Sequence, residues 1–148
     1  MKQYLPTVLI TIVVIAGLWF VVQVSQARER QSTIAYLDRI SAPMDATIPA
    51  TRTLYAAIRT DGPKISDFDR YLDAMGKLQT AVVNITPPDN MTTTNRMLLS
   101  AIDTCTEKAK AARDAMNKAG WGAFAKPYGQ AFMDRCDAAM DGVYLPGR

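Results

Sequence analysis

The sequence predicts an all-α protein, in which an N-terminal transmembrane helix precedes a small antiparallel bundle of about four helices. One apolar segment, Leu5–Val24, contains no charged residue, and none occurs between Lys2 and Arg28. After Arg28 the apolar residues recur three or four positions apart, which is the period of a helix and not of a strand. Prolines and glycines divide this part into helical segments with short connections, a pattern typical of up-down-up-down bundles.

The apolar segment Leu5–Val24 has the length of a membrane-spanning helix. About 20 residues rising roughly 1.5 Å each cross a hydrocarbon core about 30 Å thick. A cleaved signal peptide is the alternative, because Ser25-Gln26-Ala27 places small residues around a possible cleavage site. The apolar run exceeds the roughly 7–15 residues of a signal peptide, and only Lys2 and the amino terminus precede it. We therefore interpret residues 1–27 as a transmembrane signal-anchor, with the cleaved signal peptide as the alternative.

The charges that flank this segment leave its orientation open. Lys2 lies on one side, while Arg28 and Arg30, offset by Glu29, lie on the other. Positive charge after the segment would favour a cytoplasmic C-terminal part. A hydrophobic N-terminal segment that precedes a long domain nevertheless usually exports it, so we expect residues 28–148 to form an extracytoplasmic helical bundle.

The composition excludes many kinds of site. The whole chain has 17 Lys and Arg against 14 Asp and Glu, so removing Lys2 leaves 16 against 14 and a nearly neutral domain. This balance argues against nucleic acid as a partner. The chain has no histidine, which excludes histidine-ligated metals and catalytic triads with a histidine base. No phosphate-binding loop or dinucleotide fingerprint occurs, and we expect no catalytic residue, no metal ligand, no cofactor and no enzymatic activity.

The first helix of the bundle is expected to continue the membrane helix from Arg28 to Thr60. Pro43 and Pro49 should kink or break it, because proline lacks the N–H donor and crowds the preceding turn. Ser41 would cap a restarted helix, and a stop is expected at residues 61–63, Asp-Gly-Pro.

The second helix should begin with the capping box Ser66-x-x-Asp69. Its apolar stripe consists of Phe68, Tyr71, Leu72, Met75, Leu78, Val82 and Ile85.

The third helix should be capped by Thr86, with Pro87 in its first position, and should run to about Lys118. Its apolar face becomes small toward the C-terminal half, which allows a neighbouring helix to approach closely. The face consists of Met91, Leu98, Ala101, Ile102, Cys105, Ala109, Ala112 and Met116. A fourth helix, from about Ala123 or Lys126 to Val143, carries Phe124, Tyr128, Phe132, Cys136, Ala139, Met140 and Val143.

The two cysteines lie at matching distances from the turn between the third and fourth helices, which centres near Trp121. Cys105 precedes Trp121 by 16 residues and Cys136 follows it by 15. Equidistant residues reach the same level in an antiparallel helix pair, so we predict a disulfide, with two buried free thiols as the alternative. A disulfide closing a loop of about 30 residues contributes roughly 3–4 kcal/mol in the chain-entropy model. Disulfides are typical of oxidising compartments, which again favours export.

Two groups of residues are candidates for a site. Trp121, Phe124 and Tyr128 cluster beside glycines at the predicted turn, where exposed aromatic residues would favour contact with a partner. The alternative is that they cover the end of the bundle core. The carboxylate pairs Asp69–Asp73 and Asp137–Asp141 each share a helix face, but we interpret them as ordinary solvated surface.

Three functions remain. The first is a non-catalytic single-span membrane protein, in a bacterial inner membrane with its bundle in the periplasm, that binds or stabilises a larger membrane or envelope complex as an accessory subunit. Its partners would then be the lipid bilayer and a membrane or envelope protein, with no nucleic acid. The second is a ligand-binding sensory module, similar in layout to the periplasmic four-helix domains of bacterial receptors. The third is a phage-type envelope protein such as a spanin or an exclusion protein.

Overall fold

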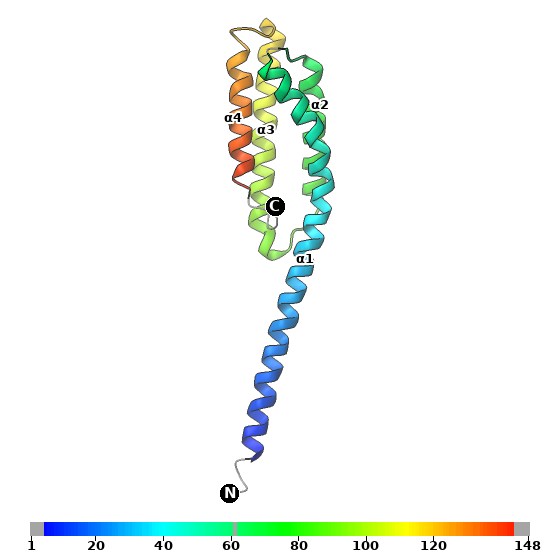
Figure 1. Cartoon of the computed structure of the whole chain (residues 1–148), viewed down its shortest axis with the longest axis vertical. Helices are drawn as coiled ribbons and strands as arrows, with labels where there is room; N and C mark the ends of the chain where they lie inside the picture. Colours follow the sequence, from blue (N-terminus) through cyan, green and yellow to red (C-terminus); the bar gives the residue numbers. More distant parts are fainter. Residues whose placement is uncertain (1–4, 61, 144–148) are drawn as a thin grey trace.

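The computed structural model describes the backbone of residues 5–60 and 62–143 and the side chains from Val22 onward in these ranges, and all regular secondary structure in this part is helical. Four α-helices follow one another: α1 (Leu5–Arg59), α2 (Ile65–Val83), α3 (Thr92–Ala119) and α4 (Lys126–Asp141). A short 3₁₀ helix, η1 (Asp89–Met91), precedes α3. Figure 1 shows the four helices running alternately up and down, as the sequence predicts.

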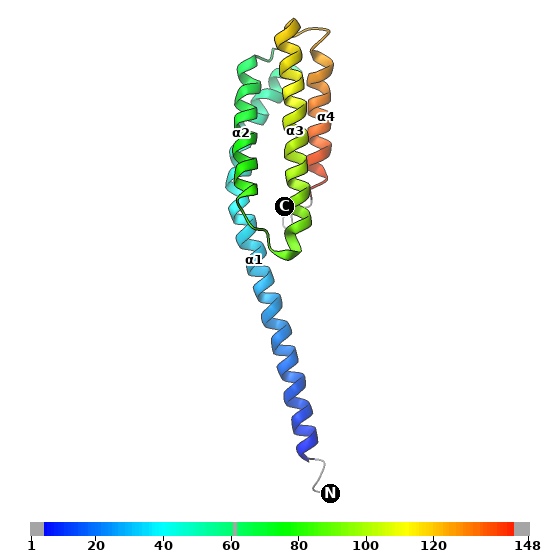
Figure 2. The same cartoon turned by 180° about the vertical axis from the view of Figure 1, so that it is seen from behind.

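Helix α1 is far longer than the others, and its first part extends away from the bundle. Figures 1 and 2 show no other described helix beside this part from either side. Among the described residues, no helix has the length and apolar character that a membrane crossing requires. The predicted transmembrane segment, Leu5–Val24, lies for most of its length outside the residues whose side chains are described, so it stays a prediction.

The bundle begins where polar side chains first connect α1 to η1 and to the start of α3. Asn90 donates a hydrogen bond from Nδ2 to Thr33 Oγ1 over 2.9 Å. One turn further along α1, the Tyr36 hydroxyl donates to Asn95 Oδ1 over 2.7 Å. Between Val22 and Thr33 nearly every described side chain of α1 is exposed. The stretch before Thr33 therefore leads to the bundle as a single, unaccompanied helix.

The prolines bend α1 without ending it, so the predicted restart at Ser41 is wrong. Ser41 lies inside the helix and donates its hydroxyl to the carbonyl of Asp38. Pro43 and Pro49 are both interior positions of α1, and the helix changes direction in its upper half (Figure 1). Pro49 is exposed while Ile40 and Leu54 are buried. Burial of such side chains, worth about 1.5–3 kcal/mol each, offsets the hydrogen bonds that the prolines remove.

The starts of α2 and α3 differ from those predicted. The N-cap of α2 is Lys64, whose backbone N–H donates to Asp67 Oδ2 over 2.9 Å. Asp67, and not Asp69, is therefore the carboxylate that satisfies the helix start. Residues 86–88 are not helical, and α3 begins only at Thr92, after η1. Local capping signals shift easily by one or more residues, because several short polar side chains compete for the same backbone donors.

The core follows the predicted stripes, and its packing is closest between α3 and α4. The buried side chains of α3 are mostly small, so the helices approach closely; on α4, Phe132, Met133 and Cys136 face them. Most of the larger core side chains come from the other helices, and α3 contributes Leu98 and Ile102. The described core residues are Tyr36, Ile40, Leu54, Ile58, Phe68, Tyr71, Met75, Leu78, Val82, Met91, Leu98, Ile102, Cys105, Ala109, Ala112, Phe132, Met133 and Cys136.

Gly129 on α4 makes room for the ring of Trp121. A Cβ atom added at Gly129 would overlap the Trp121 ring and would lie 3.5 Å from Ile58 Cγ2. Gly129 is buried, so neither neighbour can swing into solvent without opening the end of the core. A side chain as small as a methyl group is therefore excluded here by packing.

We predict that Gly129→Ala displaces the Trp121 ring and lowers the free energy of unfolding by about 1–3 kcal/mol through overpacking. The measurement is urea unfolding followed by tryptophan fluorescence. Gly76→Ala is the matched control, because Gly76 is exposed within α2 and has no atom within 4 Å of an added Cβ. That control should raise stability by about 0.5–1 kcal/mol. Equal effects of the two substitutions would contradict this packing.

Candidate functional site

A disulfide joins α3 and α4 in the middle of the bundle. Cys105 and Cys136 are bonded, with their Cα atoms 4.6 Å apart. Cys105 is fully buried and Cys136 is nearly so. The pairing predicted from the matched distances to Trp121 is therefore present, and no free cysteine occurs among the described residues.

Beside the disulfide, α1, α2 and α4 enclose a half-open groove with a volume of about 310 Å³. Its walls are mainly apolar. Because α4 packs firmly on α3 and only sparingly on α1, the side of the bundle between α1 and α4 stays open. The groove is lined by Met44, Thr47, Ile48, Thr51, Arg52 and Tyr55 of α1, Tyr71, Met75 and Leu78 of α2, and Cys136, Asp137 and Met140 of α4.

The two ends of the groove differ in polarity. Helices α2 and α4 both run antiparallel to α1 (Figure 1), so the groove residues that come first in each of these two helices lie toward the groove residue that comes last in α1, Tyr55. Tyr55, Tyr71 and Asp137 therefore meet at the upper end, toward the turn between α3 and α4. The lower end, toward the N-terminal part of α1, is apolar and is formed by Met44, Ile48, Leu78 and Met140.

A hydrogen bond between α1 and α4 closes the upper end. The Tyr55 hydroxyl donates to Asp137 Oδ1 over 2.8 Å. Burial raises the pKa of the Tyr55 hydroxyl above its usual value, and the bond to Asp137 raises it further, because both favour the neutral phenol. The Tyr55 ring packs edge-on against Phe132, with ring centroids 5.5 Å apart. Tyr55 therefore links the groove to the core.

Tyr71 forms part of the floor of the groove and is 1 % exposed. Its hydroxyl lies 3.4 Å from Cys136 Sγ. A sulfur atom is a weak hydrogen-bond acceptor, so the phenol keeps most of its capacity to donate. Burial raises the pKa of Tyr71, and the negative charge of Asp137 adds to the shift. The hydroxyl thus remains neutral, and the Asp137 charge acts on both tyrosines.

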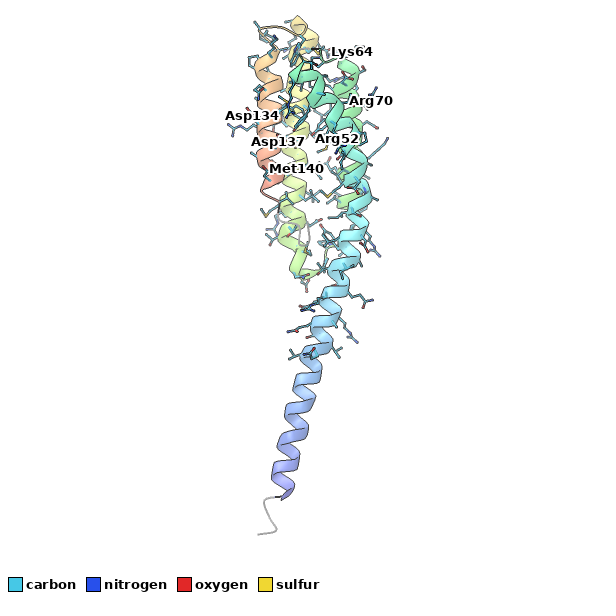
Figure 3. All side chains as sticks on the ribbon, viewed as in Figure 1. Arg52, Lys64, Arg70, Asp134, Asp137 and Met140 are labelled. Atoms are coloured by element: carbon cyan, nitrogen blue, oxygen red, sulfur yellow. A yellow bond between two sulfur atoms is a disulfide. The ribbon has the colours of Figure 1, made fainter. Side chains whose placement is uncertain are left out.

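Figure 3 labels Arg52, Asp137 and Met140 in the same part of the bundle, on α1 and α4. Arg52 is the one cationic side chain that lines the groove, and Asp137 is the one anionic side chain. The ion pairs found among the described residues do not include either of them. The groove therefore presents one positive and one negative group that are not paired with each other.

The aromatic cluster predicted at the turn is divided. Trp121 is half-buried and packs over Gly129, so it covers the end of the core, as the alternative proposed. Phe124 and Tyr128 are 52 % and 44 % exposed, and their ring centroids lie 5.7 Å apart. These two rings alone form an exposed aromatic pair, at the end of the bundle opposite to the N-terminus (Figure 1). Contact with a partner stays a prediction.

Of the two predicted carboxylate pairs, Asp69–Asp73 consists of ordinary surface groups. Asp69 Oδ1 lies 2.7 Å from Arg113 Nε, and Asp73 pairs with Lys77 over 2.7 Å within α2. Asp137 differs, because it reaches across to Tyr55 of α1. The sequence analysis missed this role, although Tyr55 and Tyr71 are signals for it: each places a polar hydroxyl within an otherwise apolar stripe. No cluster of side chains suited to a metal ion occurs in the described part.

We predict that stability falls as the pH rises above about 10, the usual pKa of tyrosine, because the unfolded state then ionises while Tyr71 and Tyr55 of the folded state stay protonated. The stabilisation is complete below this pH and is lost as the pH rises toward the raised folded-state values. Tyr71→Phe should reduce the slope of the free energy of unfolding against pH, above this pH, by about 1.4 kcal/mol per pH unit. The measurement is urea unfolding at several alkaline pH values. An unchanged slope in Tyr71→Phe would contradict the burial of this hydroxyl.

The groove and the exposed aromatic pair are thus two candidate binding surfaces of the described bundle. The first combines mainly apolar walls with two charged groups that belong to no ion pair among the described residues, and the second is a pair of solvent-facing rings. A comparison with models of protein families, with curated proteins and with solved structures finds no match for the chain.

Proposed function

We propose that the chain is a non-catalytic, single-span membrane protein whose extracytoplasmic bundle binds or stabilises a larger membrane or envelope complex. In this proposal residues 1–27 are the signal-anchor of a bacterial inner-membrane protein. Residues 28–148 form a periplasmic accessory subunit.

The observation that carries this proposal is the solitary first part of α1. Figure 1 places no other described helix of the chain beside it. A helix of strongly apolar sequence gains stability mainly from burial, and a single helix in water is marginal. The lipid bilayer supplies that burial for Leu5–Val24. Val24 to Thr33 then forms a helical spacer of about 13 Å between the bilayer and the bundle.

The disulfide supports the extracytoplasmic side. Cys105 and Cys136 are the only two cysteines of the chain, and they are bonded to each other. Structural disulfides form and persist in oxidising compartments and are rare in the reducing cytosol.

The exposed pair Phe124–Tyr128 is the proposed contact with the partner. Aromatic side chains contribute strongly at the centres of protein interfaces. The pair lies at the end of the bundle farthest from the N-terminus (Figure 1). Residues 24–59 of α1 span about 50 Å, so the partner must have a part that extends about this far from the membrane.

A sensory, ligand-binding module is the second candidate, and the groove favours it. A partly enclosed apolar groove with a few polar groups is the usual form of a small-molecule site. Such a module would bind its ligand between α1, α2 and α4 and would transmit the change along α1.

We predict that the full chain, cross-linked in its native membrane and purified in detergent, is recovered with one membrane or envelope protein in equimolar amount. Phe124→Ala combined with Tyr128→Ala should remove at least about 2 kcal/mol of binding energy and should abolish recovery of the partner. Met97→Ala is the matched control, since Met97 is an exposed apolar residue of α3 and should leave recovery unchanged. Recovery of the chain alone, or equal recovery with all variants, would contradict the proposed contact.

A further inference from the structure

We propose that the groove between α1, α2 and α4 binds an apolar α-amino acid in its zwitterionic form. The α-ammonium group would pair with Asp137, the α-carboxylate with Arg52, and the side chain would occupy the lower, methionine-lined end. This inference goes beyond the proposed function and does not rest on it, because it concerns the bundle alone.

The lower end suits an apolar side chain of moderate size. Met44 and Met140 line it together with Ile48 and Leu78, and Met75 also lines the groove. Methionine side chains are flexible and polarizable, so they adapt to ligands of differing shape. The volume of about 310 Å³ lies at the lower limit for small-molecule sites, about 300–1,000 Å³. Such a space accepts an aliphatic or thioether side chain but not a protein helix.

The upper end suits an ammonium group. Tyr55 occupies only Oδ1 of Asp137, and no described hydrogen bond or ion pair uses Oδ2. This free carboxylate oxygen accepts a hydrogen bond from an ammonium group, and charge-assisted bonds of this kind are the strong ones. The hydroxyl oxygen of Tyr55, already a donor to Asp137, has lone pairs that are available to the same ligand group.

Two further donors are available to a carboxylate. Arg52 lines the groove, is an exposed residue and makes no ion pair among the described residues. Tyr71, 1 % exposed in the floor, has the weak Cys136 sulfur as the one hydrogen-bond partner of its hydroxyl among the described residues. A buried donor without a good acceptor is costly, and a ligand oxygen relieves this cost.

The combination of charges selects the class of ligand. A groove with only Arg52 would favour a fatty acid, and a groove with only Asp137 would favour an amine. Because each charge lies on a different helix and neither belongs to an ion pair among the described residues, a molecule that carries both charges next to an apolar group satisfies both. Apolar amino acids have this composition, so we infer them as the class and not an uncharged or singly charged amphiphile.

The test is calorimetric titration of the full chain with L-leucine and L-methionine, in lipid nanodiscs if it purifies with membranes and in buffer if it does not. N-acetylleucine lacks the ammonium group and leucinamide lacks the carboxylate. Each should bind at least about tenfold more weakly than leucine, which is the loss expected for one charged hydrogen bond. Hexanol, which carries no charge, tests whether the apolar surface alone suffices.

Variants assign each charge. Asp137→Asn should weaken leucine binding about tenfold and should remove the preference for leucine over N-acetylleucine, while Arg52→Gln should remove the preference over leucinamide. The amide oxygen that Asp137→Asn introduces still accepts from Tyr55, so the fold is retained, and melting curves without ligand check this. Asp134→Asn and Arg39→Gln, at exposed positions of the same two helices, should bind leucine as the unaltered chain does.

Three results would overturn the proposal. The first is that neither L-leucine nor L-methionine at millimolar concentration gives a heat of binding. The second is hexanol binding as tightly as leucine, which would make the groove a general apolar site. The third is that the affinity ratios of leucine to N-acetylleucine and of leucine to leucinamide are the same in all variants as in the unaltered chain.

Discussion

The bond between Cys105 and Cys136 is the constraint on which the rest of the bundle depends. It holds the Cα atoms of Cys105 and Cys136 4.6 Å apart. This close approach of α3 and α4 is possible because α3 presents alanines there, among them Ala109 and Ala112. Fixing α4 against α3 leaves it with little contact to α1. The open side that results is the groove. The covalent bond therefore lies between the close contact of α3 with α4 and the groove beside it.

The sequence was a good guide where a pattern extends over many turns. The stripe from Phe68 to Val82 is buried as predicted, because one face of a long amphipathic helix must pack against the core. The cysteine pairing followed from simple antiparallel geometry. Single-residue signals were poorer guides. Pro43 and Pro49 do not end α1, since the packing of Ile40 and Leu54 outweighs the lost hydrogen bonds. The carboxylate that caps the start of α2 is Asp67 and not the predicted Asp69.

The groove was not predictable in the same way, because its members come from three helices. Tyr55, Tyr71 and Asp137 lie on separate elements, and nothing in their spacing along the chain places them together. Asp137 belonged to a predicted surface pair, and its hydrogen bond to Tyr55 depends on the lateral position of α4 relative to α1. A lateral shift of about one side-chain width would leave the hydroxyls of both tyrosines without their present neighbours. Tertiary placement, and not local sequence, creates this site.

The central claim is that an anchored chain carries a disulfide-locked bundle outside the cytoplasm, and intact mass spectrometry tests it most directly. The chain is purified from membranes of an export-competent bacterial host, denatured without reductant and alkylated, and then measured before and after reduction. The account predicts the full 148-residue mass less two hydrogen atoms, with no alkyl label, and a gain of two hydrogen atoms on reduction. A mass that lacks residues 1–27, or label on both cysteines before reduction, would contradict it.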